Sequence, residues 1–162
     1  MTRAACLPPA VDADTRLLIL GSLPGQVSLT QRQYYAHPQN QFWRLLGAVI
    51  GRELAALGYD ARLAAIARAG IGLWDVIGTA TRPGSLDSAI RNNEPNDLAA
   101  LARTLPILTA IAFNGNAAAK IGVRQLGESA LPLVSLPSSS PAYAAMPFTA
   151  KRDAWLTLRQ FL

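Results

Sequence analysis

Residues 16–21 read RLLILG, a short apolar run that ends in glycine and is typical of a buried strand. Three further runs have the same character: IGLWDVI (71–77), PILTAIAFN (106–114) and LPLVSL (131–136). Each run is bounded by residues that favour turns, and each is far shorter than the roughly 20 apolar residues that a membrane-spanning helix needs. The four runs therefore predict four buried strands.

The segments between these runs have the patterns of helices, with apolar residues three or four positions apart. Helices are predicted over residues 41–50, 52–69, 96–105, 115–122 and 149–162. Gly122 is expected to cap the fourth of them. Strands that alternate with helices indicate an α/β fold of three layers (α/β/α), with a mostly parallel four-stranded sheet covered by helices on both faces. We expect one domain over residues 1–162, with a loosely ordered N-terminus over residues 1–14.

Composition limits the possible functions. The chain is 51% hydrophobic and 15% charged, which indicates a globular protein. Its net charge of +5 and pI near 10 fit a protein that binds a polyanion, although a genome rich in arginine codons would give the same charge. With one cysteine, Cys6, and one histidine, His37, we expect no internal disulfide, no metal site and no cofactor. The absence of a signal-like N-terminus predicts a cytoplasmic protein that does not enter a membrane.

Loops that follow the predicted strands should form the site, because parallel α/β sheets bind ligands at the carboxyl ends of their strands. These loops are rich in Gly, Pro, Ser and Asn, and they read GSLPGQVSL (21–29), TATRPGSLD (79–87), FNGN (113–116) and PSSSPA (137–142). No Walker lysine loop, G-x-G-x-x-G fingerprint or G-x-S-x-G elbow is present, which weighs against a P-loop hydrolase, a Rossmann dehydrogenase and an α/β-hydrolase.

Two segments carry a family resemblance. LILGSLPG (18–25) followed by YYAHPQNQFWRLL (34–46) is similar to the start of the uracil-DNA glycosylase superfamily, and LPSSSPA resembles its second, Ser/Pro-rich motif. The mismatch-specific branch has its water-activating Asn in the first loop, where this chain has Leu23. The hypoxanthine-DNA glycosylase branch shares the Gly-Ser-x-Pro loop and is taken to use the Asn of the second segment, so this resemblance makes Asn40 the catalytic candidate.

The resemblance implies a monofunctional enzyme of base-excision repair that hydrolyses the N-glycosidic bond of a deaminated base flipped from double-stranded DNA. Hypoxanthine is the first expectation, with uracil or xanthine as alternatives. Asn40 would position the water through its amide carbonyl and Tyr35 would stack on the base, while Ser22, Asp75 and Asn114 would bind it. The expected DNA contacts are Gly21, Pro24, Gly25, His37, Ser138, Ser139, Ser140, Pro141 and Lys151. We expect the protein to act as a monomer.

The residues also allow other interpretations. Asn40 occupies a position suited to a helix N-cap, whether or not it is catalytic. Asp75 and Asn114 could bind loop backbone groups instead of a base, and Phe42 and Trp43 are expected in the core. Two other classes of function stay open: a catalytically silent DNA-binding module of the same fold, and a small-molecule hydrolase that uses His37 and a serine.

Overall fold

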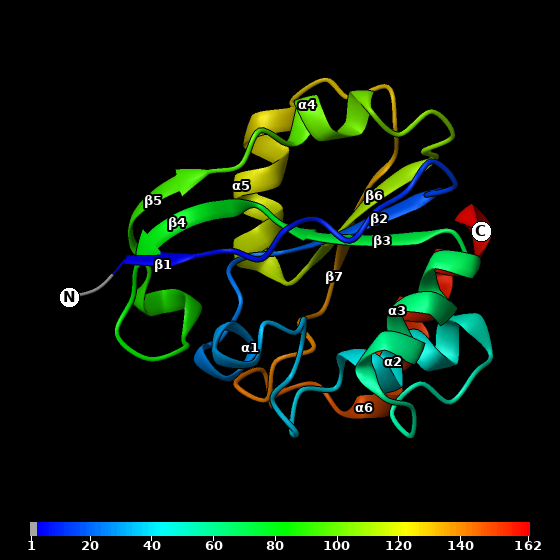
Figure 1. The fold of residues 1–162 in the computed structure, drawn as a ribbon, viewed down its shortest axis with the longest axis horizontal. Helices are drawn as coiled ribbons and strands as arrows, with labels where there is room; N and C mark the ends of the chain where they lie inside the picture. The colour runs from blue at the N-terminus through cyan, green and yellow to red at the C-terminus, as the bar shows by residue number, and fades with distance from the viewer. Residues whose placement is uncertain (1–2) are drawn as a thin grey trace.

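The structure, a computed structural model, describes residues 3–162 and contains a four-stranded parallel sheet in the order β3-β2-β6-β7 (Figure 1). The strands are β2 (Leu17–Gly21), β3 (Ile71–Asp75), β6 (Ala110–Asn114) and β7 (Leu133–Leu136). All four lie inside the predicted apolar runs, so the predicted sheet is confirmed. The register places the last residue of β2, Gly21, beside the last residue of β3, Asp75.

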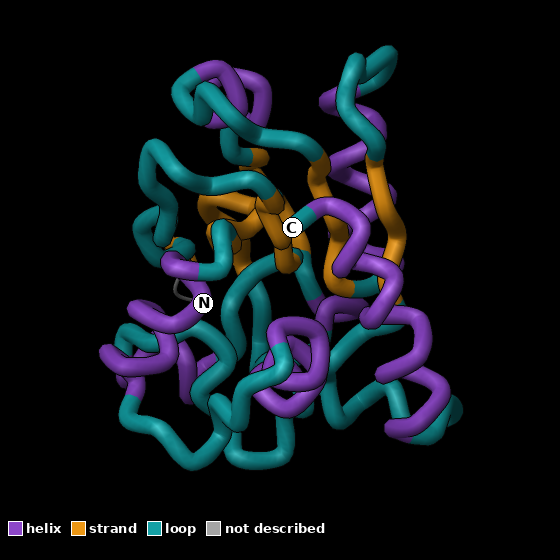
Figure 2. Tube along the Cα trace, turned by 90° about the vertical axis from the view of Figure 1, so that its right-hand side faces the viewer, coloured by secondary structure: helices purple, strands orange, loops and turns teal. Residues whose placement is uncertain are grey.

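Helices cover both faces of this sheet (Figures 1 and 2). One face packs against α2 (Phe42–Ile50), α3 (Tyr59–Arg68) and α6 (Phe148–Leu156), and the other packs against α4 (Leu98–Arg103) and α5 (Asn116–Leu126). In β2, Leu17 and Ile19 point to the first face and Leu18 and Leu20 to the second, because successive side chains of a strand alternate. All four are fully buried, which explains why the run is apolar throughout.

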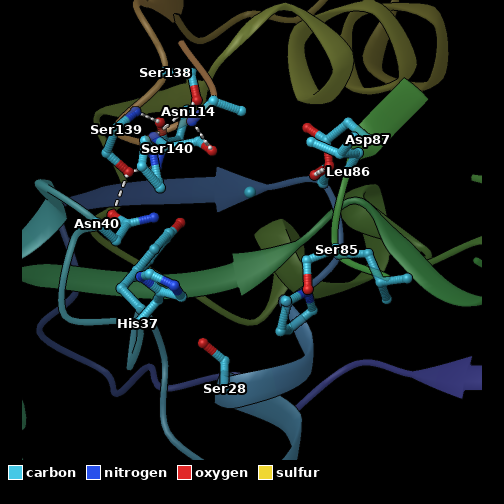
Figure 3. A pocket seen from close by; sticks show the side chains of 18 of the residues that line it. Ser28, His37, Asn40, Ser85, Leu86, Asp87, Asn114, Ser138, Ser139 and Ser140 are labelled. Atoms are coloured by element: carbon cyan, nitrogen blue, oxygen red, sulfur yellow. Dashed lines mark hydrogen bonds between the residues drawn. The ribbon is translucent and has the colours of Figure 1, made fainter. Parts of the chain in front are cut away.

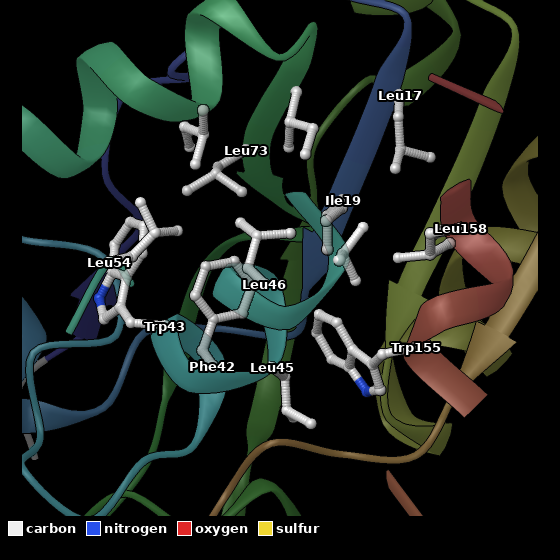
Figure 4. Close-up of a cluster of buried hydrophobic side chains, with 14 of the residues drawn as sticks. Leu17, Ile19, Phe42, Trp43, Leu45, Leu46, Leu54, Leu73, Trp155 and Leu158 are labelled. Atoms are coloured by element: carbon white, nitrogen blue, oxygen red, sulfur yellow. The ribbon is translucent and has the colours of Figure 1, made fainter. Parts of the chain in front are cut away.

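Phe42 and Trp43 belong to the core, as predicted, with 0% and 4% of their surface exposed. The Phe42 ring meets the Trp155 ring of α6 edge to face at 5.7 Å, beneath β2 (Figure 4). The Trp43 indole N–H donates to the carbonyl of Tyr34 at 3.3 Å. These contacts hold the start of α2, and with it the segment that carries His37 and Asn40, against the sheet.

A second, antiparallel sheet was not predicted. It has the order β1-β4-β5, formed by β1 (Arg3–Ala5), β4 (Ile77–Thr81) and β5 (Arg91–Pro95). The sequence of β5, RNNEP, is exposed at every position and has no apolar alternation, so its pattern gives no signal of a strand. Residues 82–90 between β4 and β5 include a short 3₁₀ helix, η1 (Asp87–Ala89), and reach over the end of β2.

The prediction of a loosely ordered N-terminus over residues 1–14 is wrong for residues 3–14. Residues 1–2 lie outside the described part of the chain. Strand β1 pairs with β4, and Ala10 forms an antiparallel bridge with Leu73 of the main sheet. The segment is ordered by these backbone hydrogen bonds, which its own sequence does not reveal.

Three helix boundaries differ from the predictions by more than two residues. The helix expected over 52–69 begins only at Tyr59, because residues 51–58 form turns and Gly58 precedes its first turn. Helix α5 continues past Gly122 to Leu126. Gly122 is needed inside that helix, since a Cβ there would lie 2.0 Å from the Phe113 ring. Helix α6 ends at Leu156 and a 3₁₀ helix, η2 (Thr157–Phe161), follows it. A short helix that was not predicted, α1 (Gln26–Gln31), follows the first loop.

Candidate active site

A cleft of about 650 Å³ opens at the carboxyl ends of the parallel strands, where the sequence predicted the site. It is lined by all the predicted site residues except Lys151, namely Gly21, Ser22, Pro24, Gly25, Tyr35, His37, Asn40, Asp75, Asn114, Ser138, Ser139, Ser140 and Pro141. The four strand-following loops therefore do meet in one pocket. Residues 85–88 complete its wall from the connection between β4 and β5.

Asn40 lies one residue before Gln41, the N-cap residue of helix α2, and its side-chain oxygen caps the first backbone N–H of the helix. Its Oδ1 accepts the backbone N–H of Phe42 at 2.9 Å and the Ser139 hydroxyl at 2.8 Å. Because a backbone N–H can only donate, the atom that faces Phe42 must be the amide oxygen, which leaves Nδ2 on the cleft side (Figure 3). The expected use of the carbonyl to hold water does not fit, since both lone pairs of that oxygen are engaged. Asn40 offers the cleft a donor instead.

Asn114 and Ser139 pair with each other at the end of β6. The Asn114 Nδ2 donates to Ser139 Oγ and the Ser139 backbone N–H donates to Asn114 Oδ1, each at 2.9 Å. Together with Asn40 they form a group that we call the amide frame (Asn40, Asn114 and Ser139). The Ser139 hydroxyl is 1% exposed, accepts from Asn114 and donates to Asn40, so it has no proton left for a phosphate. The expected DNA contact by this hydroxyl does not fit its place in the frame.

Ser138 and Ser140, on either side of Ser139, are partly exposed. The Ser138 Oγ accepts the N–H of Ser140, and the Ser140 Oγ accepts the N–H of Ala142. Their hydroxyl protons therefore point away from these bonds and are available as donors to an anion. The phosphate contacts of Ser138 and Ser140 stay a prediction, which these free hydroxyl protons allow.

Tyr35 and Asp75 form what we call the cleft floor. Of all the buried side-chain polar atoms in residues 3–162, only Tyr35 Oη and Asp75 Oδ2 have no hydrogen-bond partner. Gly21 makes room for both groups, because a Cβ at this position would lie 2.7 Å from Asp75 Oδ1 and 3.0 Å from Tyr35 Oη. An enclosed polar atom without a partner costs about 1–3 kcal/mol, so such atoms are uncommon without a purpose.

Burial raises the pKa of the Asp75 carboxyl to about 7; the Asp87 carboxylate adds to the rise and the Arg82 guanidinium opposes it. Burial also raises the pKa of the Tyr35 phenol, and Asp75 adds to that rise. The neighbouring Asn114 amide opposes the rise without completing a hydrogen bond to the phenol. Titratable groups shifted in this way and gathered in a cleft are typical of functional sites.

The Tyr35 backbone is held in an unusual conformation. Its φ is +54°, a left-handed value that costs a residue other than glycine free energy and persists only where the surroundings impose it. The ring stacks on Phe42, with 3.7 Å between centroids and 15° between planes. Phe42 thus covers one face of the Tyr35 ring.

Arg82 supports the wall of the cleft without lining it, and the sequence pattern did not reveal this role. It is 6% exposed, and its guanidinium donates to the carbonyls of Leu23, Pro24 and Gly84. It thereby joins the loop after β2 to the connection after β4. The only signal in the sequence was its place in the segment RPGSLD, which also supplies Ser85 and Asp87.

Asp87 and Ser85 reinforce this joint. The Ser22 hydroxyl donates to Asp87 Oδ1 at 2.7 Å, and the Gln26 backbone N–H donates to Ser85 Oγ at 2.9 Å. Ser22, which was predicted to bind the base, is 8% exposed, and its hydroxyl proton is already donated to Asp87. The loop after β2 is therefore fixed before any ligand arrives.

Lys151 does not lie where the prediction placed it. Its side chain is 2% exposed, its ammonium donates to Gln41 Oε1 at 3.0 Å, and it lies 5.1 Å from the centroid of the Tyr143 ring. Burial lowers the pKa of this lysine. The expected contact with DNA does not fit, because α6 faces the core at this position and encloses the ammonium.

His37 is exposed at the rim of the cleft, and its Nδ1 accepts the backbone N–H of Gln39 at 3.1 Å. No serine hydroxyl in residues 3–162 forms a hydrogen bond with it. The serine–histidine pair that a small-molecule hydrolase would need is thus not assembled. The described residues also contain no group of three or more His, Cys, Asp or Glu that could hold a metal. Within the same range, no helix is long and apolar enough to span a bilayer.

Comparison with known proteins identifies relatives along nearly the whole chain. The model of the uracil DNA glycosylase superfamily matches residues 8–159. A hypoxanthine DNA glycosylase of Methanosarcina barkeri is 48% identical over 108 residues, which cover 67% of this chain and 68% of that protein. Another hypoxanthine DNA glycosylase, from Methanosarcina acetivorans, is 44% identical over 111 residues, 68% of this chain and 70% of the relative.

A solved structure has the same fold. The solution NMR structure of a Methanosarcina acetivorans protein, provisionally assigned as a uracil DNA glycosylase, superposes with a TM-score of 0.86. The two chains are 36% identical, and the match covers 99% of each. The fold that the sequence resemblance implied is confirmed.

Proposed function

This chain belongs to the uracil DNA glycosylase superfamily, and from that premise we propose that it is a DNA glycosylase that hydrolyses the N-glycosidic bond of a deaminated base. Hypoxanthine is the first candidate, because two relatives more than 40% identical are hypoxanthine DNA glycosylases. The observation that carries the proposal is the cleft, which gathers the residues of both resembling segments around two unpaired buried groups, Tyr35 Oη and Asp75 Oδ2.

The substrate is DNA with the damaged nucleotide turned out of the stack, since neither base edge nor sugar can be reached inside a duplex. Ser138 and Ser140 supply free hydroxyl donors at the mouth of the cleft, where they would fix the phosphate backbone. The base enters below these two serines. It lies beside the face of the Tyr35 ring that Phe42 does not cover, and the Asp75 carboxyl meets the edge of the base.

Asn40 is the catalytic residue in this proposal, and it acts as a donor. Its oxygen is committed to Phe42 and Ser139, so Nδ2 holds the oxygen of the attacking water. One lone pair of that water remains free for C1′ of the sugar. The transition state resembles an oxocarbenium ion and does not require a strong base, so positioning of this kind can supply much of the barrier reduction.

The test is excision from duplex oligonucleotides that carry deoxyinosine, deoxyuridine or deoxyxanthosine, followed by alkali to cut at abasic sites. We expect alkali-dependent breaks at the damaged base, fastest with deoxyinosine. DNA binding without breaks at any of these bases would instead identify a silent binding module, and the proposed activity would be wrong.

Two variants of Asn40 separate its roles. In Asn40→Asp the carboxylate still accepts from Phe42 and Ser139, so the cap is kept while the donor is lost. We expect Asn40→Asp to fold as stably as the parent and to excise about 10²–10³-fold more slowly, the usual cost of one lost catalytic donor. Asn40→Ala loses both cap and donor, and should also unfold more easily by about 1 kcal/mol. Parental excision by a folded Asn40→Asp would reduce Asn40 to a cap.

A further inference from the structure

The cleft floor contains a carboxyl group with no protein partner. Neither oxygen of Asp75 accepts a hydrogen bond from any residue in the range 3–162, and Oδ2 is fully enclosed. Its neighbour Tyr35 Oη is enclosed and unpaired as well. Tyr35 and Asp75 both line the cleft, so a ligand that reaches the end of β3 would meet the Asp75 side chain. An arrangement of this kind prepares a polar surface for a polar partner.

The surroundings of Asp75 do not favour a carboxylate. The positive charge of Arg82 acts on Asp75, but its guanidinium donates its hydrogen bonds to the carbonyls of Leu23, Pro24 and Gly84. Asp87 faces Asp75 from η1 with a like charge. The other titratable neighbours, Tyr34, Tyr35 and Cys6, are neutral near pH 7, and Asp75 raises the pKa of each of them.

Resting on the proposed function, we propose that Asp75 binds the flipped base as a neutral carboxylic acid, donating its O–H to the base carbonyl and accepting the adjacent lactam N–H. Hypoxanthine presents N1–H beside its C6 carbonyl, and uracil presents N3–H beside its C4 carbonyl. A protonated carboxyl has one donor and one acceptor at the spacing of this pair, whereas a carboxylate has acceptors only and would repel the carbonyl oxygen. The substrate class that this edge selects is a base with a lactam group.

The same contact favours bond cleavage. When the bond between C1′ and the base nitrogen breaks, its electron pair passes to the base, and part of the negative charge collects on the lactam oxygen. In the bound complex the Asp75 O–H points at that oxygen before the bond breaks, and the hydrogen bond strengthens as the charge develops. The proton stays on Asp75 throughout. The base leaves as an anion and takes up a proton from solvent, while the water that has bonded to C1′ loses one proton to solvent.

The experiment is single-turnover excision from a deoxyinosine duplex between pH 5.5 and pH 8.0. With the pKa of Asp75 at about 7, the parental rate should be flat below pH 6 and fall about tenfold from pH 6 to pH 8, as the donor is lost. Asp75→Ala should be slower by about 10²-fold and insensitive to pH, because it has lost the donor. Asp75→Asn also presents a donor and an acceptor, so it should recover most of that loss and show no fall at high pH.

The opposite pattern overturns the inference. A parental rate that rises through pH 7, with a folded Asp75→Asn as slow as Asp75→Ala, would mean that Asp75 works as a carboxylate. Circular dichroism and urea unfolding of each variant separate this outcome from misfolding. If the folded parent releases no base from deoxyinosine, deoxyuridine or deoxyxanthosine at any pH, the proposed function fails instead of the role of Asp75.

Discussion

The amide frame and the cleft floor lie in the same cleft but differ in how their polar atoms are paired. In the frame, Ser139 joins Asn40 to Asn114 through bonds of 2.8 and 2.9 Å, and both amide oxygens have partners. On the floor, Tyr35 Oη and Asp75 Oδ2 have none. A group that is already paired holds the loops in place, whereas an enclosed unpaired group is ready to meet a ligand. Substitutions in the two regions should therefore change stability in opposite directions.

The strongest effect is expected at Asp75. Its pKa is raised above the ordinary value of 3.8, so its contribution to stability is present below about pH 4 and is lost as the pH rises through about 7. Asp75→Asn does not titrate. The free energy of unfolding of this variant, relative to the parent, should increase by about 2–4 kcal/mol between pH 4 and pH 8. Urea unfolding at several pH values measures the difference, and a difference that does not change with pH would contradict it.

Ser139→Ala should act in the other direction. The change removes an acceptor from Asn114 and a donor from Asn40 at a position that is 1% exposed. We expect the free energy of unfolding to fall by about 2–3 kcal/mol. Ser138→Ala is the matched control in the same loop, where a partly exposed hydroxyl should cost less than about 1 kcal/mol. An equal loss of unfolding free energy in the two variants would show that the hydrogen bonds of Ser139 stabilise the fold no more than those of the partly exposed Ser138.

Asp87→Asn tests the electrostatics of the floor without touching Asp75. The Asp87 carboxylate is one cause of the raised pKa of Asp75, so its removal should lower that pKa. The fall of the excision rate at high pH should then begin at a lower pH, while the rate near pH 5.5 changes little because Asn keeps an acceptor for the Ser22 hydroxyl. An unchanged or raised midpoint in the pH–rate profile would show that the Asp87 charge does not raise the pKa of Asp75.

The weakest effect is expected at Lys151, which lies outside both regions. Its ammonium is enclosed against Gln41 and Tyr143, so Lys151→Met should leave the salt dependence of DNA binding unchanged. A lysine that contacts a phosphate would instead reduce the slope of log affinity against log salt by about one. Fluorescence anisotropy with a labelled duplex between 50 and 200 mM salt, roughly the range over which such contacts weaken, distinguishes the two results.

Local patterns in the chain were sufficient to predict the main sheet and the position of the cleft. Runs such as Leu17–Leu20 are apolar throughout because both faces of a parallel strand are covered, and that pattern is local. The loops that follow such strands must meet at one edge, so the meeting of Asp75, Asn114 and the serine loop follows from the order of strands and helices alone. The resemblance of the 34–46 segment then singled out Asn40.

The role of each polar group, in contrast, depends on the tertiary fold. The Asn40 amide turns its nitrogen to the cleft because Ser139, 99 positions away, donates to its oxygen together with Phe42. Strand β5 exists because β4 offers it a partner, since its own residues are polar and exposed. The lysine at position 151 suggested an exposed charge that could contact DNA, but the fold buries this side chain. Hydrogen-bond partners and burial come from residues distant in the chain, and local patterns do not contain them.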